Sequence, residues 1–416
     1  MRKHLRKITS VCLMLGALCF ALPLVAQSTP PTGMHAYKIV LQDVTDKDVR
    51  VGAARTNIYL PFIQGKRIAV CANHTSLIGK THLVDSLHSL GVDIVRVFAP
   101  EHGFRGRVEA GKTVTNDTDA KTGIPIVSLY GKHKKPTAED MKSIDIVLFD
   151  IQDVGARFYT YISTLHYVME AAAEHKVTVM VLDRPNPNGF WVDGPVLDPK
   201  FASFVGMHPV PVVHGMTVGE YALMINGEKW LKDGMQCDLK IVNVERYDHA
   251  LRYQLPVAPS PNLPSMEAVY LYPSLCLFEG TPLSIGRGTD KPFRLLGYPD
   301  CPNGSVQFKP KSLPGVAMHP PFEGKKCKGY DLSEFSLAIM KNQPFLHVEL
   351  LLEMYKSYPD KEHFFIPMFN KLAGSDQLQQ QIKAGMTAEA IRASWKTDLD
   401  KFKRLRKKYL LYADFE

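Results

Sequence analysis

From Arg67 to Asn186 the chain repeats one pattern, a short apolar run that ends on polar or charged residues. The runs that follow this pattern are residues 67–71, 94–98, 125–129, 146–149 and 178–182. Continuous apolar runs of this length are typical of parallel strands that are buried on both faces. The sequence therefore predicts an α/β fold built on a parallel sheet.

Helical spacing fills several of the segments between and after these runs. Leucine and valine side chains recur at this spacing in 83–90, ahead of Gly91, and residues 158–175 carry one long apolar face. Thr217 and Glu220 have the spacing of a capping box that opens a helix through Trp230. Further elements are expected as a strand at 238–244 and helices near 267–277 and 387–409.

The length of 416 residues favours two domains. Four prolines between residues 255 and 264 are typical of a linker or a wall-forming loop. We therefore expect one domain at 57–255 and a second, smaller one at 265–416.

The first 26 residues have the organisation of a secretory signal peptide. Four basic residues precede an apolar stretch from Ile8 to Phe20, and small residues follow at Leu24 to Ala26. Export to the periplasm or the medium is expected, without a membrane span after cleavage. Removing four positive charges lowers the formal net charge from +8 to +4.

The remaining charge and cysteines suggest no special partner. The basic residues near the C-terminus favour a solvated helix face over a surface for nucleic acid. Five cysteines remain without close-spaced pairs, so neither a zinc site nor a disulfide scaffold is indicated. Cys301 and Cys327 are the pair that could form a disulfide after export.

The segment from Glu101 to Gly106 holds the sharpest cluster of chemical groups. An acid, an imidazole and Arg105 follow a strand end within a loop that Gly103 allows to turn tightly. Ligands bind outside the carboxyl ends of strands in open α/β sheets. A carboxyl partly withdrawn from water suits a general acid, which makes Glu101 the candidate. The alternative is a structural pair between Glu101 and Arg105.

Two further strand ends carry polar groups. Asp150, Gln152 and Asp153 end one strand, and Asp153 is equally compatible with a helix N-cap or with a functional role. The stiff loop from Asp183 to Asn188 offers amides that suit sugar hydroxyls, although a structural Asp183–Arg184 arrangement is as plausible. In the second half, Arg287 stands between two glycines, where an open loop would present its guanidinium to a carboxylate.

Several other chemistries are disfavoured. No Gly-x-Gly-x-x-Gly follows the first strand, and no Gly-x-Ser-x-Gly or His-Glu-x-x-His is present. Residues 106–113 match the letters of a P-loop but lack the strand before it and the helix after it. No cofactor is expected.

The motifs together resemble one family, the exo-β-N-acetylmuramidases, a glycoside hydrolase family long known as a domain of unknown function. The resemblance covers about residues 57–416. The motifs that carry it are Glu101-His-Gly-Phe-Arg-Gly, Asp150-Ile-Gln-Asp-Val-Gly-x-Arg-Phe-Tyr-Thr-Tyr, Asp183-Arg-Pro-Asn-Pro, Pro259-Ser-Pro-Asn, Leu277-Phe-Glu-Gly-Thr and Gly286-Arg-Gly-Thr.

The resemblance implies a Rossmann-like N-terminal domain, a smaller C-terminal α/β (α+β) domain and a site in the cleft between them. It also implies release of terminal N-acetylmuramic acid from the non-reducing end of peptidoglycan fragments, with the catalytic glutamate at Glu101. A second catalytic role is open to Asp150, to Asp153 or to the acetamido group of the substrate. The candidate substrate-binding residues are Asn73, His102, Arg105, Gln152, Arg157, Tyr159, Asp183, Arg184, Asn186, Asn262, Glu279 and Arg287.

Two other classes of function remain open at this point. A sugar-binding or cell-wall-binding protein could use the same cleft without catalysis. A metal-dependent hydrolase could use Glu101, His102 and Asp150 as ligands.

Overall fold

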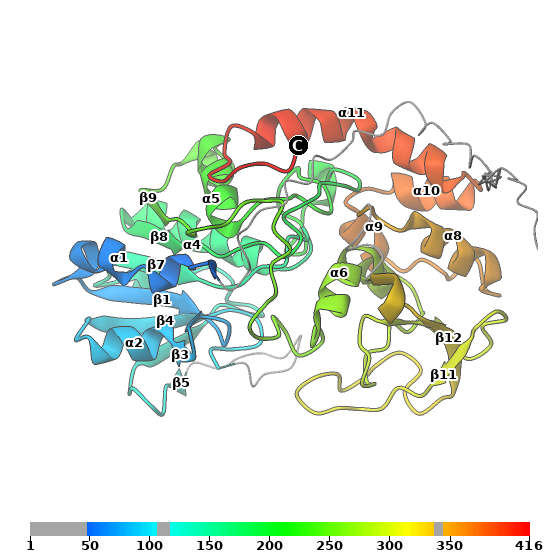
Figure 1. The fold of residues 1–416 in the computed structure, drawn as a ribbon, viewed down its shortest axis with the longest axis horizontal. Coiled ribbons are helices and arrows are strands. Elements are labelled where there is room, and N and C mark those ends of the chain that lie inside the picture. Colours follow the sequence, from blue (N-terminus) through cyan, green and yellow to red (C-terminus); the bar gives the residue numbers. More distant parts are fainter. Residues whose placement is uncertain (1–47, 106–116, 337–343) are drawn as a thin grey trace, which may run out of the picture. The chain divides into compact units, whose positions relative to one another are not determined.

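A computed structural model describes residues 48–105, 117–336 and 344–416 (Figure 1). The expected signal peptide and the P-loop-like stretch at 106–113 thus lie outside the described residues. Within these three ranges, no helix is both long and apolar enough to span a membrane.

The predicted parallel sheet is confirmed, and each of the five predicted apolar runs contributes a strand. Its parallel strands are β1 (Ile68–Ala72), β4 (Ile94–Ala99), β6 (Pro125–Ser128), β7 (Ile146–Asp150), β8 (Thr178–Leu182) and β9 (Leu239–Val242), with β5 (Asp117–Thr118) antiparallel at one edge. The spatial order is β5-β6-β4-β1-β7-β8-β9. Numbered along the chain, the parallel strands read 3-2-1-4-5-6, which is the Rossmann order. From β1 the successive strands are added first toward one edge of the sheet and then, from β7 on, toward the other. Such folds bind their ligands at the point where the strand order reverses, which here lies beside β1.

Helices cover both faces of this sheet, which explains why its strands lack polar alternation. Ala69 and Cys71 of β1 belong to the core that includes α4 (Tyr161–His175) and α5 (Val218–Gly227). Val70 and Ala72 belong to a second core with α1 (Thr56–Ile63) and α2 (Leu83–Ser89). Every residue of β1 is buried, as expected for a strand between two helical layers.

Two helix starts differ in an informative way. The capping box of Thr217 and Glu220 is confirmed, since each side chain accepts a hydrogen bond from the backbone of the other residue. By contrast, α4 begins at Tyr161 and not at Phe158, so residues 158–160 form a turn across the strand ends. Asp153 is therefore not the N-cap of this helix; the N-cap residue is Thr160.

The second half of the chain is α+β, as expected. A three-stranded antiparallel sheet and a set of helices follow α6 (Met266–Leu275) and the short 3-10 helix η5 (Cys276–Gly280). These elements are β10 (Leu295–Tyr298), β11 (Val306–Phe308), β12 (Cys327–Asp331), α8 (Val348–Ser357), α9 (Met368–Ala373), α10 (Gln377–Lys383) and α11 (Ala388–Arg406). Smaller elements nearer the N-terminus are β2 (Leu77–Ile78), β3 (Thr81–His82) and α3 (Ala138–Met141).

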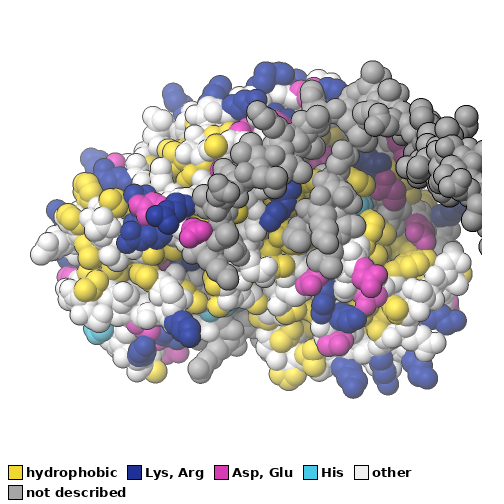
Figure 2. Space-filling view, in the orientation of Figure 1, with side chains coloured by type: hydrophobic (Ala, Val, Ile, Leu, Met, Phe, Trp, Pro, Cys, Tyr) yellow, Lys and Arg dark blue, Asp and Glu magenta, His cyan; other side chains and the backbone are white. Residues whose placement is uncertain are grey.

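The C-terminal helix α11 leads the chain back to the Rossmann-like half (Figure 1). The buried Arg406 donates to the carbonyl of Gly215 at 2.7 Å, and Tyr412 donates to Asp183 at 2.6 Å. The basic residues of this helix are partly paired within it, as with Lys396 and Asp400. Figure 2 shows Lys and Arg side chains along this edge with acidic ones among them, as a solvated face would have.

The cysteines do not form the suggested disulfide. Cys301 and Cys327 are both buried free thiols, as are Cys71, Cys237 and Cys276. Their side chains pack in the interior as small apolar groups.

Candidate active site

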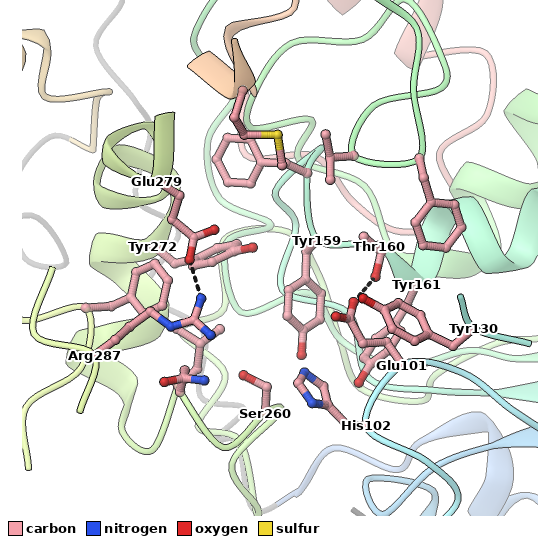
Figure 3. A pocket seen from close by; sticks show the side chains of 17 residues that line it. Glu101, His102, Tyr130, Tyr159, Thr160, Tyr161, Ser260, Tyr272, Glu279 and Arg287 are labelled. Carbon is pink, nitrogen blue, oxygen red and sulfur yellow. Dashed lines mark hydrogen bonds and ion pairs between the residues drawn. The ribbon is translucent and has the colours of Figure 1, made fainter. Parts of the chain in front are cut away.

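A cavity of about 320 Å³ brings together residues from both halves of the chain (Figure 3). Six of the predicted site residues line it, namely Glu101, His102, Tyr159, Asn262, Glu279 and Arg287. The remaining lining residues are Tyr130, Phe158, Thr160, Tyr161, Phe204, Val205, Ser260, Leu263, Tyr272, Phe293 and Met368.

Glu101 lies just beyond the end of β4 and is partly buried. Its Oε2 atom accepts a hydrogen bond from the Thr160 hydroxyl at 2.9 Å. Figure 3 shows Tyr130 and Tyr161 on the same side of the cavity, beside this carboxyl group. The turn before α4 therefore fixes the orientation of Glu101 through a direct contact.

His102 adopts a left-handed backbone conformation, with φ of 69°. This conformation is unfavourable for residues other than glycine. Non-glycine residues that adopt it cluster at functional sites. The imidazole is buried and lines the cavity below the Tyr159 hydroxyl (Figure 3). Gly103 continues the same tight turn with φ of 77°.

Arg105 anchors the loop that carries Glu101, and it does so away from the cavity. Its guanidinium contacts Asp119 at 2.7 Å and Asp85 of α2 at 2.9 Å. The hydrogen bond from Arg105 lowers the pKa of Asp119 to about 2. Arg105 therefore pairs with Asp85 and Asp119, and the alternative of a structural Glu101–Arg105 pair is wrong.

The opposite wall of the cavity holds a second charged pair. Nη1 of Arg287 lies 2.5 Å from Oε1 of Glu279. Gly286 and Gly288 both have φ of 80°, and a Cβ atom at either position would meet a backbone oxygen at 2.4 Å. The flanking glycines are therefore required by the path of the loop that presents Arg287.

Asp150 is not brought to the cavity. It forms a buried ion pair with Arg184, whose Nε and Nη2 atoms lie 2.6 and 2.9 Å from the two carboxylate oxygens. The side chains are only 0% and 3% exposed. Because Asp150 faces Arg184, the structure does not join it to Glu101 and His102 as a metal site. In the described part of the chain, no three His, Cys, Asp or Glu side chains are placed to hold a metal ion.

Asp153 is buried and does not line the cavity. Its Oδ2 atom accepts from the backbone of Gly155 at 2.7 Å and lies 3.8 Å from Nε2 of His214. Burial raises the pKa of Asp153 to about 7 and lowers that of His214 to about 3. Gly155 is needed here, since its φ is 75° and a Cβ atom would meet the Asn186 side chain at 2.3 Å.

Arg157 is fully buried and does not line the cavity. Its two terminal nitrogens donate to the carbonyls of Pro195, Val210 and Leu372, each at 2.8 Å. The contact with Leu372 of α9 ties the two halves of the chain together. Burial lowers the pKa of Arg157 to about 9.

The other predicted residues outside the cavity lining are also buried and form hydrogen bonds within the protein. Asp183 accepts from Thr217, Gly219 and Tyr412, and burial raises its pKa to about 6. The remaining three also have partners: Asn73 with Thr75, Gln152 with the carbonyls of Asp153 and Pro185, and Asn186 with Met216 and Asn188.

Several side chains that line the cavity were not among the residues predicted from the sequence. Thr160 and Tyr161 stand in the same aromatic motif as Tyr159, so their position in the sequence was a usable signal. Tyr130 directly follows a predicted strand and could have been found by the same rule as Glu101. Tyr272 lies within the apolar face of α6, where its sequence gives no such sign.

The fold and this cavity define a two-part α/β protein with a carboxylate and an imidazole at the strand ends of a Rossmann-like sheet. Sequence profiles named "Exo-beta-N-acetylmuramidase NamZ, N-terminal" and "C-terminal" match residues 68–267 and 270–412. The chain belongs to this NamZ family.

Individual relatives agree with this assignment. The peptidoglycan beta-N-acetylmuramidase NamZ of Bacillus subtilis strain 168 is 40% identical over 378 residues, which are 85% of this chain and 89% of the relative. Crystal structures of two DUF1343 family proteins from Bacteroides fragilis NCTC 9343 share the fold. One is 45% identical with a TM-score of 0.81 and the other 29% identical with a TM-score of 0.75. Each alignment covers 88% of this chain and 99% of the neighbour.

The raised pKa of Asp153 predicts a pH-dependent stability. The folded state holds this proton up to a pH of about 7, whereas an ordinary aspartate loses it near 3.8. The contribution of Asp153 is therefore complete below pH 3.8 and falls as the pH rises toward about 7. We expect Asp153→Asn to raise Tm relative to the native protein more at pH 8 than at pH 5. Thermal unfolding at both values measures this, and an equal difference would contradict a buried, proton-holding carboxyl.

Proposed function

We propose that this protein is an exo-acting glycosidase that removes N-acetylmuramic acid from the non-reducing end of peptidoglycan fragments during cell-wall turnover. The observation that carries the proposal is the placement of Glu101, whose carboxyl group lies in a cavity built by both halves of the chain. The family and the muramidase from Bacillus subtilis support the choice of substrate.

Glu101 acts as the proton donor to the leaving oxygen. A glycosidase needs such a donor because the departing alkoxide is a poor leaving group in water. The hydrogen bond from Thr160 holds one carboxyl oxygen, which leaves the other oxygen to meet the glycosidic bond. The phenol groups of Tyr130 and Tyr161 beside the acid limit its freedom to turn away (Figure 3).

Arg287 binds the lactyl carboxylate that distinguishes muramic acid from glucosamine. A guanidinium carries five N–H donors, so the contact with Glu279 leaves others for a ligand. Arg287 lies on the wall opposite Glu101 (Figure 3). This arrangement supports a sugar bound between them, with charge recognition on one side and proton donation on the other.

Replacing the acid tests the proposal. Glu101→Gln keeps the size of the side chain but cannot donate the proton, so turnover should fall by about 100-fold or more. The measurement is release of free N-acetylmuramic acid from a muramic-acid–glucosamine disaccharide, with Glu139→Gln on the exposed face of α3 as control. Near-native turnover of a folded Glu101→Gln protein would remove Glu101 from this role, and no release by the native protein would refute the function.

The role of Arg287 has its own test. Arg287→Ala should reduce kcat/KM for the muramic substrate by about 10- to 100-fold, the value of one charge-assisted hydrogen bond. The loss should be much smaller for a glucosamine analogue without the lactyl group. Arg294→Ala, which changes an arginine outside the cavity lining, serves as control. Equal losses on both substrates would show that Arg287 does not read the carboxylate.

The enzyme is exported and works in the periplasm or outside the cell. This proposal rests on the basic and apolar composition of residues 1–26. Expression of the full gene should give a mature protein that begins near Gln27, as read by mass spectrometry of the N-terminal peptide. An intact N-terminus on protein recovered from the cytoplasm alone would contradict export.

A further inference from the structure

Among the described residues, the cavity lining holds no unengaged second carboxylate that could attack the sugar. Among the described residues that line it, the carboxylates are Glu101 and Glu279. Glu279 is occupied on both oxygens, by Arg287 at 2.5 Å and by the thiol of Cys276 at 3.7 Å. Asp150 and Asp153, the two candidates from the sequence, are buried outside the lining and bound to other partners.

The phenols of the cavity are unsuited to replace that carboxylate. Burial raises the pKa of Tyr159, Tyr161 and Tyr272, and the nearby negative charge of Glu101 raises that of Tyr161 further. These groups therefore remain protonated near neutral pH. A protonated phenol is a hydrogen-bond donor and a poor nucleophile.

Asn262 presents an acceptor that has no partner within the described residues. Its Nδ2 atom donates to the carbonyl of Val316 at 2.9 Å, which fixes the amide orientation. Its Oδ1 atom is buried without a hydrogen bond, although the residue lines the cavity and is only 5% exposed. A buried acceptor of this kind needs an N–H or O–H from water or from a ligand. The N–H of a sugar acetamido group has the necessary chemistry.

From these contacts we infer that the substrate supplies its own nucleophile, the carbonyl oxygen of its 2-acetamido group, and that Asn262 orients this group by accepting its N–H. This inference rests on the proposed glycosidase function.

The reaction then has two steps. The acetamido oxygen bonds to C1 and forms an oxazolinium ion, while the C1–O bond to the leaving group breaks and the leaving oxygen takes the proton from Glu101. Water next attacks C1 and gives a proton to Glu101, and the bond from C1 to the acetamido oxygen opens. The acetamido group is restored, and the β configuration is retained.

Fluorination of the acetamido methyl group tests the inference on the native enzyme. Each fluorine makes the carbonyl oxygen a weaker nucleophile, so kcat should fall along the series from acetyl to trifluoroacetyl muramic glycosides, by about 100-fold in all. NMR should show the β-anomer as the first product, and a muramic thiazoline should inhibit competitively.

A flat series, an inverted first product or a covalent adduct on a carboxylate found by mass spectrometry would overturn the inference. Each of these outcomes leaves the hydrolysis of the N-acetyl substrate intact, so failure here is distinct from failure of the muramidase function.

Asn262→Ala tests the orienting residue. We expect at least about a tenfold loss in kcat and in affinity for the thiazoline, because one buried hydrogen bond to the ligand is lost. Asn303→Ala, in an exposed loop, is the matched control. Thermal unfolding establishes that the variant is folded. Unchanged affinity for the thiazoline in folded Asn262→Ala would remove Asn262 from this role.

Discussion

The buried ion pair of Asp150 and Arg184 is the interaction on which the position of the site depends. It joins the carboxyl ends of β7 and β8, and Arg184 also donates to Leu77 of the small hairpin at 3.0 Å. Leaving either charge without its partner would cost about 3–5 kcal/mol. The segment that leads from the end of β7 to Thr160 begins at Asp150. The ion pair therefore holds the start of the segment whose Thr160 hydroxyl donates to Glu101.

The same burial explains which site residues could be found from the sequence. The apolar runs predicted the strands correctly because both faces of the sheet are covered, and the strand-end rule identified Glu101 and His102, which line the cavity. The same rule did not separate these residues from Asp150 and Asp153, which do not line the cavity. A polar residue that satisfies a buried partner and one that awaits a ligand have the same appearance in a sequence, and only the partner's position tells them apart.

The residues of the opposite wall could not be predicted from local sequence patterns, for a different reason. Asn262 and Arg287 lie in loops and Glu279 lies in η5, and contacts with distant parts of the chain position such residues, as between Asn262 and Val316. Spacing within a loop does not report such contacts, so these residues entered through the resemblance to a family and through the two glycines beside Arg287. Thr160 was missed because an aromatic run suits a helix start, whereas packing across the strand ends keeps residues 158–160 out of α4.

The backbone at His102 shows how the local fold serves the chemistry. In an extended chain, consecutive side chains point in opposite directions, so Glu101 and His102 would normally face apart. The left-handed φ of 69° turns the chain between them, and both side chains line the same cavity. Glycine would adopt this φ at no steric cost, whereas histidine is strained by about 1–3 kcal/mol. The loop withstands this strain because Arg105 holds its far end by two ion pairs. The placement of an acid and an imidazole in one cavity therefore depends on the whole loop and on its anchor at Arg105.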